Sequence, residues 1–154
     1  MDENELRQLI AEHEEMKHDT AFGILTKPGL TIESRKQIDA VAIVFIDIDK
    51  VHALNDKYGY DKVNDMVKSA MKIRQDDILL TGRWFSGDEI VLIVKGDPAG
   101  VSKRLMESLN KHGLSATIAY TPLNNELEKA VKRASDRVEL AKHNDNRGVI
   151  IEVA

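Results

Sequence analysis

The chain has 154 residues, 42% hydrophobic and 31% charged, which is typical of a soluble globular protein made of one domain with at most a short extension. A formal net charge of −4 argues against a broad nucleic-acid-binding surface, and the absence of cysteine excludes disulfides and thiolate metal sites and fits a reducing compartment. The apolar runs are far shorter than a membrane span and the N-terminus is acidic, so we expect a cytoplasmic protein that binds neither nucleic acid nor a membrane.

The start of the chain predicts an amphipathic helix, because apolar residues recur there at roughly helical spacing: Leu6, Leu9, Ile10 and Met16. This helix either packs on the core of its own domain or serves as a linker or dimerisation element. We therefore divide the chain into an N-terminal helix, residues 1–18, and one main domain, residues 19–154.

Turns and a short helix are expected at the start of the main domain. Residues 19–30 include Pro28 and Gly29 and predict turns, and residues 31–39 predict the short helix.

The next apolar run, Val41 to Ile46, has strand length and many β-branched residues, which predicts a buried central strand. Asp47-Ile48-Asp49 ends this strand. A polar loop is expected from Asn55 to Asp61, and apolar residues at helical spacing then predict a helix from Val63 to about Arg74.

Two strand-like runs, residues 78–80 and 90–94, are joined by a short polar turn that contains glycine, which predicts a β-hairpin. The turn carries two adjacent acids, Asp88 and Glu89. If the hairpin pairs with the first strand, Asp47 meets Asp88 or Glu89 at one place, where they could hold a hard cation.

The rest of the chain alternates helices and strands. A helix over residues 101–109 should stop at His112-Gly113, and a strand over 115–121, a helix over 127–141 and a strand over 148–153 should follow. An antiparallel hairpin within this alternation predicts an α/β sandwich of the ferredoxin-like (palm) type, with a central, mostly antiparallel sheet flanked by helices.

Five short segments occur in an informative order. Ser86-Gly87-Asp88-Glu89-Ile90 resembles the five-residue signature of the GGDEF domain, the catalytic domain of diguanylate cyclases, and Asp47-Ile48-Asp49 resembles its first metal-binding strand end. Asn55-Asp56-Lys57-Tyr58-Gly59-Tyr60 resembles the family's Asn-Asp-x-x-Gly-His segment. Asp19-Thr20-Ala21-Phe22-Gly23-Ile24 is similar to its entry motif, and Ala141-Lys142 to the Ala-Lys of its last helix.

This resemblance implies an enzyme that condenses two GTP molecules into cyclic di-GMP and releases pyrophosphate. Such phosphoryl chemistry depends on positioning and on neutralising phosphate charge, for which Mg²⁺ (or Mn²⁺) is suited. By the resemblance, the side chain of Asp47, the carbonyl of Ile48 and Asp88 would bind the metal. Asp47, Asp88 and Glu89 would be the catalytic residues, with Glu89 binding metal or activating the attacking hydroxyl.

The resemblance also implies a phosphate site. The backbone amides of Asp49, Lys50 and Val51 open a helix and would cradle phosphates. Lys142 matches the family's cation for the terminal phosphates. Arg147 lies one residue beyond the family's arginine and would take its place.

Base recognition would fall to Asn55, which would contact the purine edge, while Gly87 would let the substrate approach the signature turn closely. By the resemblance, Asn64 stands where the family has an aspartate that binds guanine. An amide cannot accept both of the hydrogen bonds that guanine donates, so selectivity for guanine would weaken or the site would also bind adenine. Ser86 and Ile90 replace the first Gly and the Phe of the signature, and Ser86 adds a small side chain near the nucleotide.

The leading hypothesis is a diguanylate cyclase-like enzyme that must form at least a transient homodimer, because one site holds one triphosphate. The N-terminal helix would dimerise the chain or dock a protein partner.

One alternative is a catalytically inactive GGDEF-like module that binds a nucleotide or a protein, favoured by the departures at Ser86 and Asn64 and at Val51 and His52, where the family commonly has Phe and Lys. The other alternative is a cyclic dinucleotide synthase that uses ATP or both purines. We assign no product-inhibition site, because Arg74-Gln75-Asp76-Asp77 lies farther from Ser86 than the family's Arg-x-x-Asp pattern does.

Overall fold

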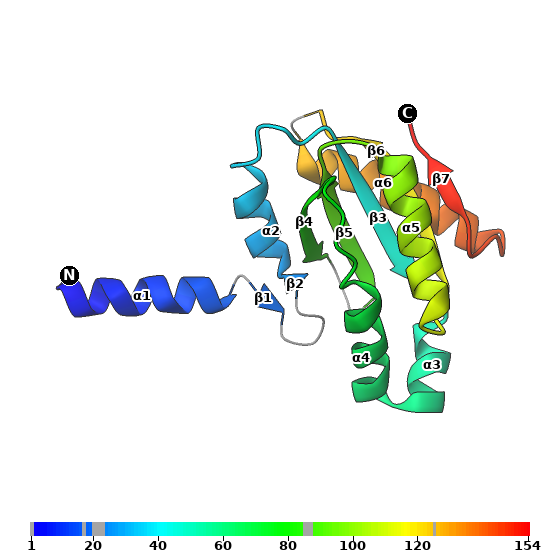
Figure 1. Ribbon diagram of the computed structural model, residues 1–154, viewed down its shortest axis with the longest axis horizontal. Helices are drawn as coiled ribbons and strands as arrows, with labels where there is room; N and C mark the ends of the chain where they lie inside the picture. The colour runs from blue at the N-terminus through cyan, green and yellow to red at the C-terminus, as the bar shows by residue number, and fades with distance from the viewer. Residues whose placement is uncertain (1, 17, 20–23, 85–87, 125) are drawn as a thin grey trace.

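The computed structural model describes residues 2–16, 18–19, 24–84, 88–124 and 126–154. Its elements, in chain order, are α1 (Glu3–Met16), β1 (His18–Asp19), β2 (Ile24–Leu25), α2 (Lys27–Ser34), β3 (Ala42–Ile48), α3 (Val51–Tyr58), α4 (Tyr60–Ala70), β4 (Ile78–Arg83), β5 (Glu89–Val94), α5 (Pro98–Lys111), β6 (Ala116–Pro122), α6 (Leu127–His143) and β7 (Ile150–Glu152) (Figure 1).

The strands form one sheet in the order β1-β2-β4-β5-β3-β6-β7. The predicted hairpin is present as β4 and β5, and the central strand β3 is antiparallel to both β5 and β6. Parallel pairing occurs between β2 and β4 and between β6 and β7. The predicted mostly antiparallel sheet with flanking helices is therefore confirmed.

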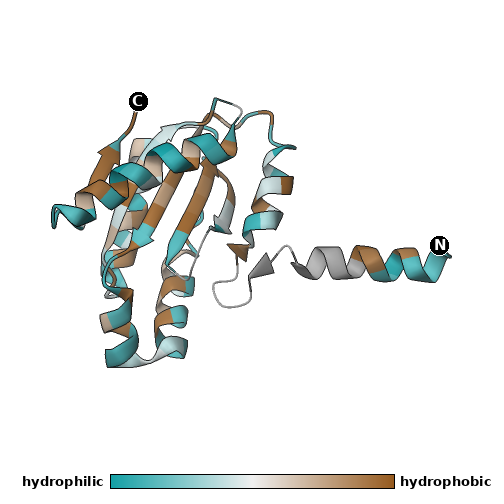
Figure 2. Ribbon diagram, turned by 180° about the vertical axis from the view of Figure 1, so that it is seen from behind, coloured by the Kyte–Doolittle hydropathy of each residue, from teal (hydrophilic) through white to brown (hydrophobic). Residues whose placement is uncertain are grey.

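Helices cover both faces of the sheet, so β3 is buried on each side. Alternate side chains of β3, such as Val44 and Ile46, pack with the residues of α4 and α5. Ile43 and Phe45 point the other way and pack with α2 and α6. Figure 2 shows the apolar strands behind α6, whose ribbon alternates hydrophilic and hydrophobic residues. A strand buried on two faces explains why this segment is continuously apolar rather than alternating.

Helix α2 begins at Lys27, so the expectation of turns up to residue 30 is wrong. Thr26 caps the helix by accepting a hydrogen bond from the Gly29 amide (3.2 Å), and proline is compatible with a first helical turn. The helix then packs closely on the sheet, because a Cβ at Gly82 of β4 would lie 2.8 Å from the Cβ of Leu30.

The predicted polar loop from Asn55 to Asp61 is also wrong, since most of it is helical. Helix α3 runs to Tyr58 and α4 starts at Tyr60, with only Gly59 between them. Gly59 has a φ of 85°, which glycine adopts without the strain that a side chain would add. By contrast, the predicted helix stop at His112-Gly113 is confirmed: α5 ends at Lys111, and Gly113 has a φ of 79°.

Helix α1 projects away from the sheet (Figure 1), and its apolar residues Leu6, Leu9 and Ile10 are about half exposed. These residues do not pack on the core of the chain, so of the two expectations only the linker or dimerisation role stays a prediction.

The short strands β1 and β2 were not expected, and β1 crosses the predicted boundary after residue 18. Within the described ranges, no helix combines the length and apolar character that crossing a membrane requires.

Candidate functional site

The pairing of β3 with β5 brings together the two acidic positions singled out in the sequence. Asp47 stands directly opposite Glu89 in the antiparallel ladder. One residue further along, the Ile48 amide donates a hydrogen bond to the carbonyl oxygen of Asp88 at 3.0 Å. Asp47 therefore lies at the same end of the sheet as Asp88 and Glu89, and it shares a face of the sheet with Glu89, the residue directly opposite.

A cleft of about 510 Å³ opens at this end of the sheet. With the exception of His52, all its lining residues belong to the predicted site: Asp47, Ile48, Lys50, Val51, Asn55, Asp88, Lys142 and Arg147. The cleft thus combines acids from β3 and the hairpin, the first turn of α3, the end of α6 and the segment before β7.

The Lys142 ammonium lies among oxygen atoms at the end of β3. Its Nζ is 3.3 Å from Oδ1 of Asp47 and 3.1 Å from Oδ1 of Asp49. It also donates to the backbone carbonyls of Asp47 (3.4 Å) and Ile48 (3.3 Å). The lysine side chain is only 18% exposed, so this cation is held within the protein rather than in solvent.

Asp49 serves as a buried structural anion. Its carboxylate accepts hydrogen bonds from the hydroxyls of Ser115 (2.7 Å) and Thr117 (2.8 Å). Burial alone would raise the pKa of Asp49, but the hydrogen bonds from these hydroxyls and from Lys142 outweigh burial and lower the pKa. The Asp49 amide donates to the carbonyl of Ser115 at 2.8 Å, so this amide is engaged inside the fold and the predicted phosphate cradle is reduced to Lys50 and Val51.

The pKa of Asp47 is shifted in the opposite direction from that of Asp49. Burial raises the pKa of Asp47 to about 6, Lys142 opposes this rise, and the charges of Asp88 and Glu89 add to it. Burial and the two neighbouring acids therefore outweigh the contact with Lys142.

These donors fit a hard divalent ion. The carboxylates of Asp47 and Asp88 and the carbonyl of Ile48 line one cleft, and the oxygens of Asp47 and Ile48 already contact a cation, the Lys142 ammonium. Among the described residues, no three acidic or imidazole side chains converge on one point, so a metal here would need the Ile48 carbonyl and ligands from a substrate or water.

The N-terminus of α3 faces the same cleft. Lys50 adopts a left-handed conformation (φ 54°) before the helix and makes no side-chain cap, and the first helical hydrogen bond runs from the Leu54 amide to the Lys50 carbonyl. The amides of Val51 and His52 precede that bond, so the positive end of the helix points to where an anion would bind.

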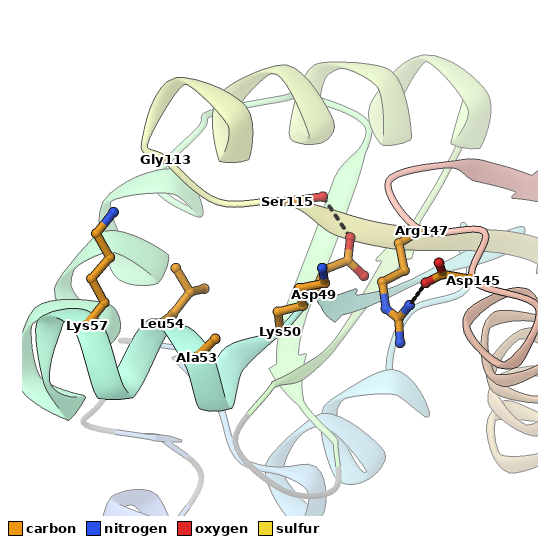
Figure 3. Close-up of a pocket in the computed structure, with 9 residues that line it drawn as sticks. All are labelled: Asp49, Lys50, Ala53, Leu54, Lys57, Gly113, Ser115, Asp145 and Arg147. Atoms are coloured by element: carbon orange, nitrogen blue, oxygen red, sulfur yellow. Dashed lines mark hydrogen bonds and ion pairs between the residues drawn. The ribbon is translucent and has the colours of Figure 1, made fainter.

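A second hollow, about 540 Å³, lies on the other side of α3 (Figure 3). Ala53, Leu54 and Lys57 line it from the helix, and Arg147 reaches it while paired with Asp145. Although this hollow is larger, we place the site in the cleft because the acids and Lys142 meet there.

Several predicted site residues lie elsewhere. Glu89 lines a different hollow, of about 270 Å³, beside Trp84, although its charge acts on Asp47. Asn64 is half-buried on α4 and, among the described residues, does not line the cleft with Asn55. Ser86 and Gly87 lie outside the described residues. His52 lines the cleft but was assigned no role, and its place in the first turn of a helix was the available signal.

No family model matches the chain. The diguanylate cyclase DgcS of Shewanella oneidensis is 30% identical over 118 residues, which cover 66% of this chain and 40% of DgcS. The chain thus matches less than half the length of that relative.

Solved structures share the fold over most of the chain. One is the coiled coil and GGDEF domain of DgcB from Caulobacter crescentus in complex with c-di-GMP (TM-score 0.70, 12% identity, 97% of this chain and 93% of that chain). A diguanylate cyclase/phosphodiesterase from Caldicellulosiruptor saccharolyticus has a TM-score of 0.70, 19% identity and coverage of 92% of this chain and 96% of its own. The diguanylate cyclase SiaD from Pseudomonas aeruginosa, in complex with its activator SiaC, has a TM-score of 0.68, 18% identity and coverage of 97% and 67%. The chain has the fold of GGDEF domains, and the resemblance predicted from its motifs is confirmed.

Proposed function

We propose that this GGDEF-fold chain is a diguanylate cyclase-like enzyme that condenses two GTP molecules into cyclic di-GMP with release of pyrophosphate. The observation that carries the proposal is the single cleft in which Asp47, Asp88, Lys142 and the N-terminus of α3 meet. Acids for a metal, a cation for phosphates and helix amides are the parts that phosphoryl transfer needs.

In this reaction the ribose 3′-hydroxyl of one GTP attacks the α-phosphorus of another. In each of the two attacks that close the ring, a new oxygen–phosphorus bond forms, the bond from the α-phosphorus to the oxygen that bridges it to the β-phosphate breaks, and one pyrophosphate leaves. Asp47, Ile48 and Asp88 would hold Mg²⁺ (or Mn²⁺), which would neutralise phosphate charge when bound. Glu89 would accept the hydroxyl proton; it stands opposite Asp47 but lines the adjoining hollow, so this role requires the attacking ribose to reach that side of the hairpin.

The protein's own groups would orient the triphosphate. The amides of Lys50 and Val51, with that of His52 beside them, would bind phosphate oxygens at the start of α3, and Lys142 and Arg147 would contact the phosphates from their own side of the cleft. Asn55, in the same cleft, would contact the purine edge.

Each domain would hold one triphosphate, so two chains must face each other for turnover. We assign α1 as the dimerising element, because Leu6 and Leu9 are about half exposed on a helix that projects from the domain. Replacing both leucines with aspartate should lower the dimer fraction in sedimentation velocity, whereas the control Gln8→Glu should not. An unchanged dimer fraction in the double variant would remove α1 from the proposal.

An inactive GGDEF-like binding module is the second candidate. It is supported by the departures at Ser86, Val51 and His52, by the internal pairing of Lys142 and by the lack of a matching family model. SiaD, a neighbour in fold, is complexed with an activator protein, so a protein partner is part of both candidates. A third candidate, a synthase that accepts ATP or both purines, rests on Asn64.

One experiment separates the three candidates. The purified chain is incubated with GTP, ATP or both in the presence of Mg²⁺, and the products are resolved by mass. We expect cyclic di-GMP from GTP, its loss in Asp88→Ala, and its retention in the control Asp76→Ala, which changes an exposed acid outside the cleft. Adenine-containing products would favour the third candidate. If the chain binds nucleotide but forms no cyclic product under any condition, the inactive binding module becomes the supported function and the enzyme proposal is wrong.

A further inference from the structure

We propose that Lys142 is an internal cation that holds the metal position of the cleft, and that it must leave the oxygens of Asp47 and Ile48 before a divalent ion can bind them. The inference rests on the proposed function and adds to it an order of events. Lys142 would be a positioning residue that excludes free metal and yields only when a triphosphate offers it a new partner.

The geometry around the ammonium carries the first step. Nζ of Lys142 contacts Oδ1 and the carbonyl oxygen of Asp47 at 3.3 and 3.4 Å and the carbonyl oxygen of Ile48 at 3.3 Å. The Asp47 carboxylate and the Ile48 carbonyl are also two of the three donors assigned to the metal. An ammonium and a divalent ion cannot share these oxygens at close range, because the two cations repel each other.

The surroundings of Lys142 show what holds it against the oxygens of Asp47 and Ile48. It lies in the last turn of α6, and its side chain is 18% exposed. Its remaining contact, Oδ1 of Asp49 at 3.1 Å, belongs to a carboxylate that Ser115 and Thr117 fix in place. Asp49 therefore provides an anchor from which the flexible lysine stem can turn without losing every partner.

The same cleft offers the place to which Lys142 would turn. The first turn of α3 lines it opposite α6, so a triphosphate bound at the α3 amides would lie within the volume that Lys142 also lines. Phosphate oxygens would then replace Asp47 and Ile48 as partners of the ammonium. Metal and triphosphate would bind together more tightly than either alone.

The test measures Mn²⁺ binding to the nucleotide-free chain by electron paramagnetic resonance of the free ion. We expect Lys142→Met to bind Mn²⁺ about tenfold more tightly than wild type, because the competing cation is gone. The control is Lys132→Met, which removes an exposed lysine of the same helix that pairs with Asp136 instead. This variant should bind Mn²⁺ as wild type does. A non-hydrolysable GTP analogue should tighten Mn²⁺ binding to wild type and have less effect in Lys142→Met.

A purely structural role for Lys142 predicts a different result. In that case Lys142→Met would bind Mn²⁺ equally or more weakly, or neither form would bind it, and any of these results overturns the inference. Lys142→Gln keeps hydrogen-bonding atoms without the charge and repeats the test if the methionine variant unfolds. In wild type, the Lys142 side-chain NMR signals should shift on addition of Mg²⁺ with the analogue. Because these measurements follow binding rather than product, an inactive chain can pass them and an active chain can fail them.

Discussion

Replacing Asp47 with asparagine should stabilise the metal-free chain at neutral and higher pH. Burial and the neighbouring acids raise the pKa of Asp47 from 3.8 to about 6 in the folded chain. A carboxyl group with a raised pKa binds its proton more tightly in the folded than in the unfolded state. Its contribution to stability is therefore fully present below pH 3.8 and is lost as the pH rises through about 6.

The size of the effect follows from the shift. One pKa unit corresponds to about 1.4 kcal/mol, so the charged Asp47 costs the folded state at most about 3 kcal/mol above pH 7. Asparagine has no charge to bury, and Lys142 keeps its contact with Asp49 in the variant. We expect Asp47→Asn to be more stable than wild type by about 1–3 kcal/mol at pH 8 and to differ little at pH 4.

Urea unfolding in the presence of a metal chelator, at pH 4, 6 and 8, would measure this difference. Asp136→Asn, a change of a largely exposed acid on α6, should show no comparable gain at pH 8. Addition of Mg²⁺ together with a non-hydrolysable GTP analogue at pH 8 should stabilise wild type and reduce the gap, because the ion then binds the folded wild type and the variant has lost a ligand. A wild type that is as stable as Asp47→Asn at pH 8, with no change in the difference between pH 4 and 8, would refute the electrostatic account of this site.

Three further changes test separate parts of the structure. Ser115→Ala removes a 2.7 Å hydrogen bond from the buried Asp49 carboxylate and should lower the free energy of unfolding by about 1–3 kcal/mol; a loss within error would show that the bond is dispensable. Gly82→Ala would place a Cβ 2.8 Å from Leu30 and should cost about 1–3 kcal/mol in urea unfolding, unless α2 can shift freely, in which case the midpoint stays unchanged. Asn64→Asp should raise the ratio of GTP to ATP affinity about tenfold in a binding titration, and an unchanged ratio would remove Asn64 from base recognition.

Local patterns in the sequence were sufficient where one element decides its own structure. The unbroken apolar run through Ile46 predicted a strand buried on both faces, and packing on both sides of β3 confirms it. The hairpin followed from two apolar runs with a polar turn between them, and its acids meet β3 as expected. The helix stop at Gly113 followed from glycine's ability to adopt positive φ.

The same local rules failed where residues that usually break structure are used inside it. Pro28 and Gly29 predicted turns, but both belong to the first turn of α2, where proline loses no hydrogen bond. The polar residues around Asn55 resembled a loop, although they lie on α3, which packs Val51 and Leu54 against the core and has no fully buried residue. Polar helices of this kind give a weak periodic signal.

The sequence by itself determined the fold class, the central strand, the hairpin and the later helices and strands, and its motifs singled out the acids and the lysine that line the cleft. It did not predict β1, β2 or the helical course of residues 55–58. Only the tertiary structure decided how the acids and the lysine act on one another. Lys142 is 95 residues from Asp47 along the chain, yet its ammonium contacts that residue's carbonyl and carboxylate. The Asp49 amide, which could have cradled a phosphate, is bound instead by Ser115. Charges and hydrogen bonds depend on distance and burial in space, and these arise from packing between distant segments rather than from the spacing of residues along one element.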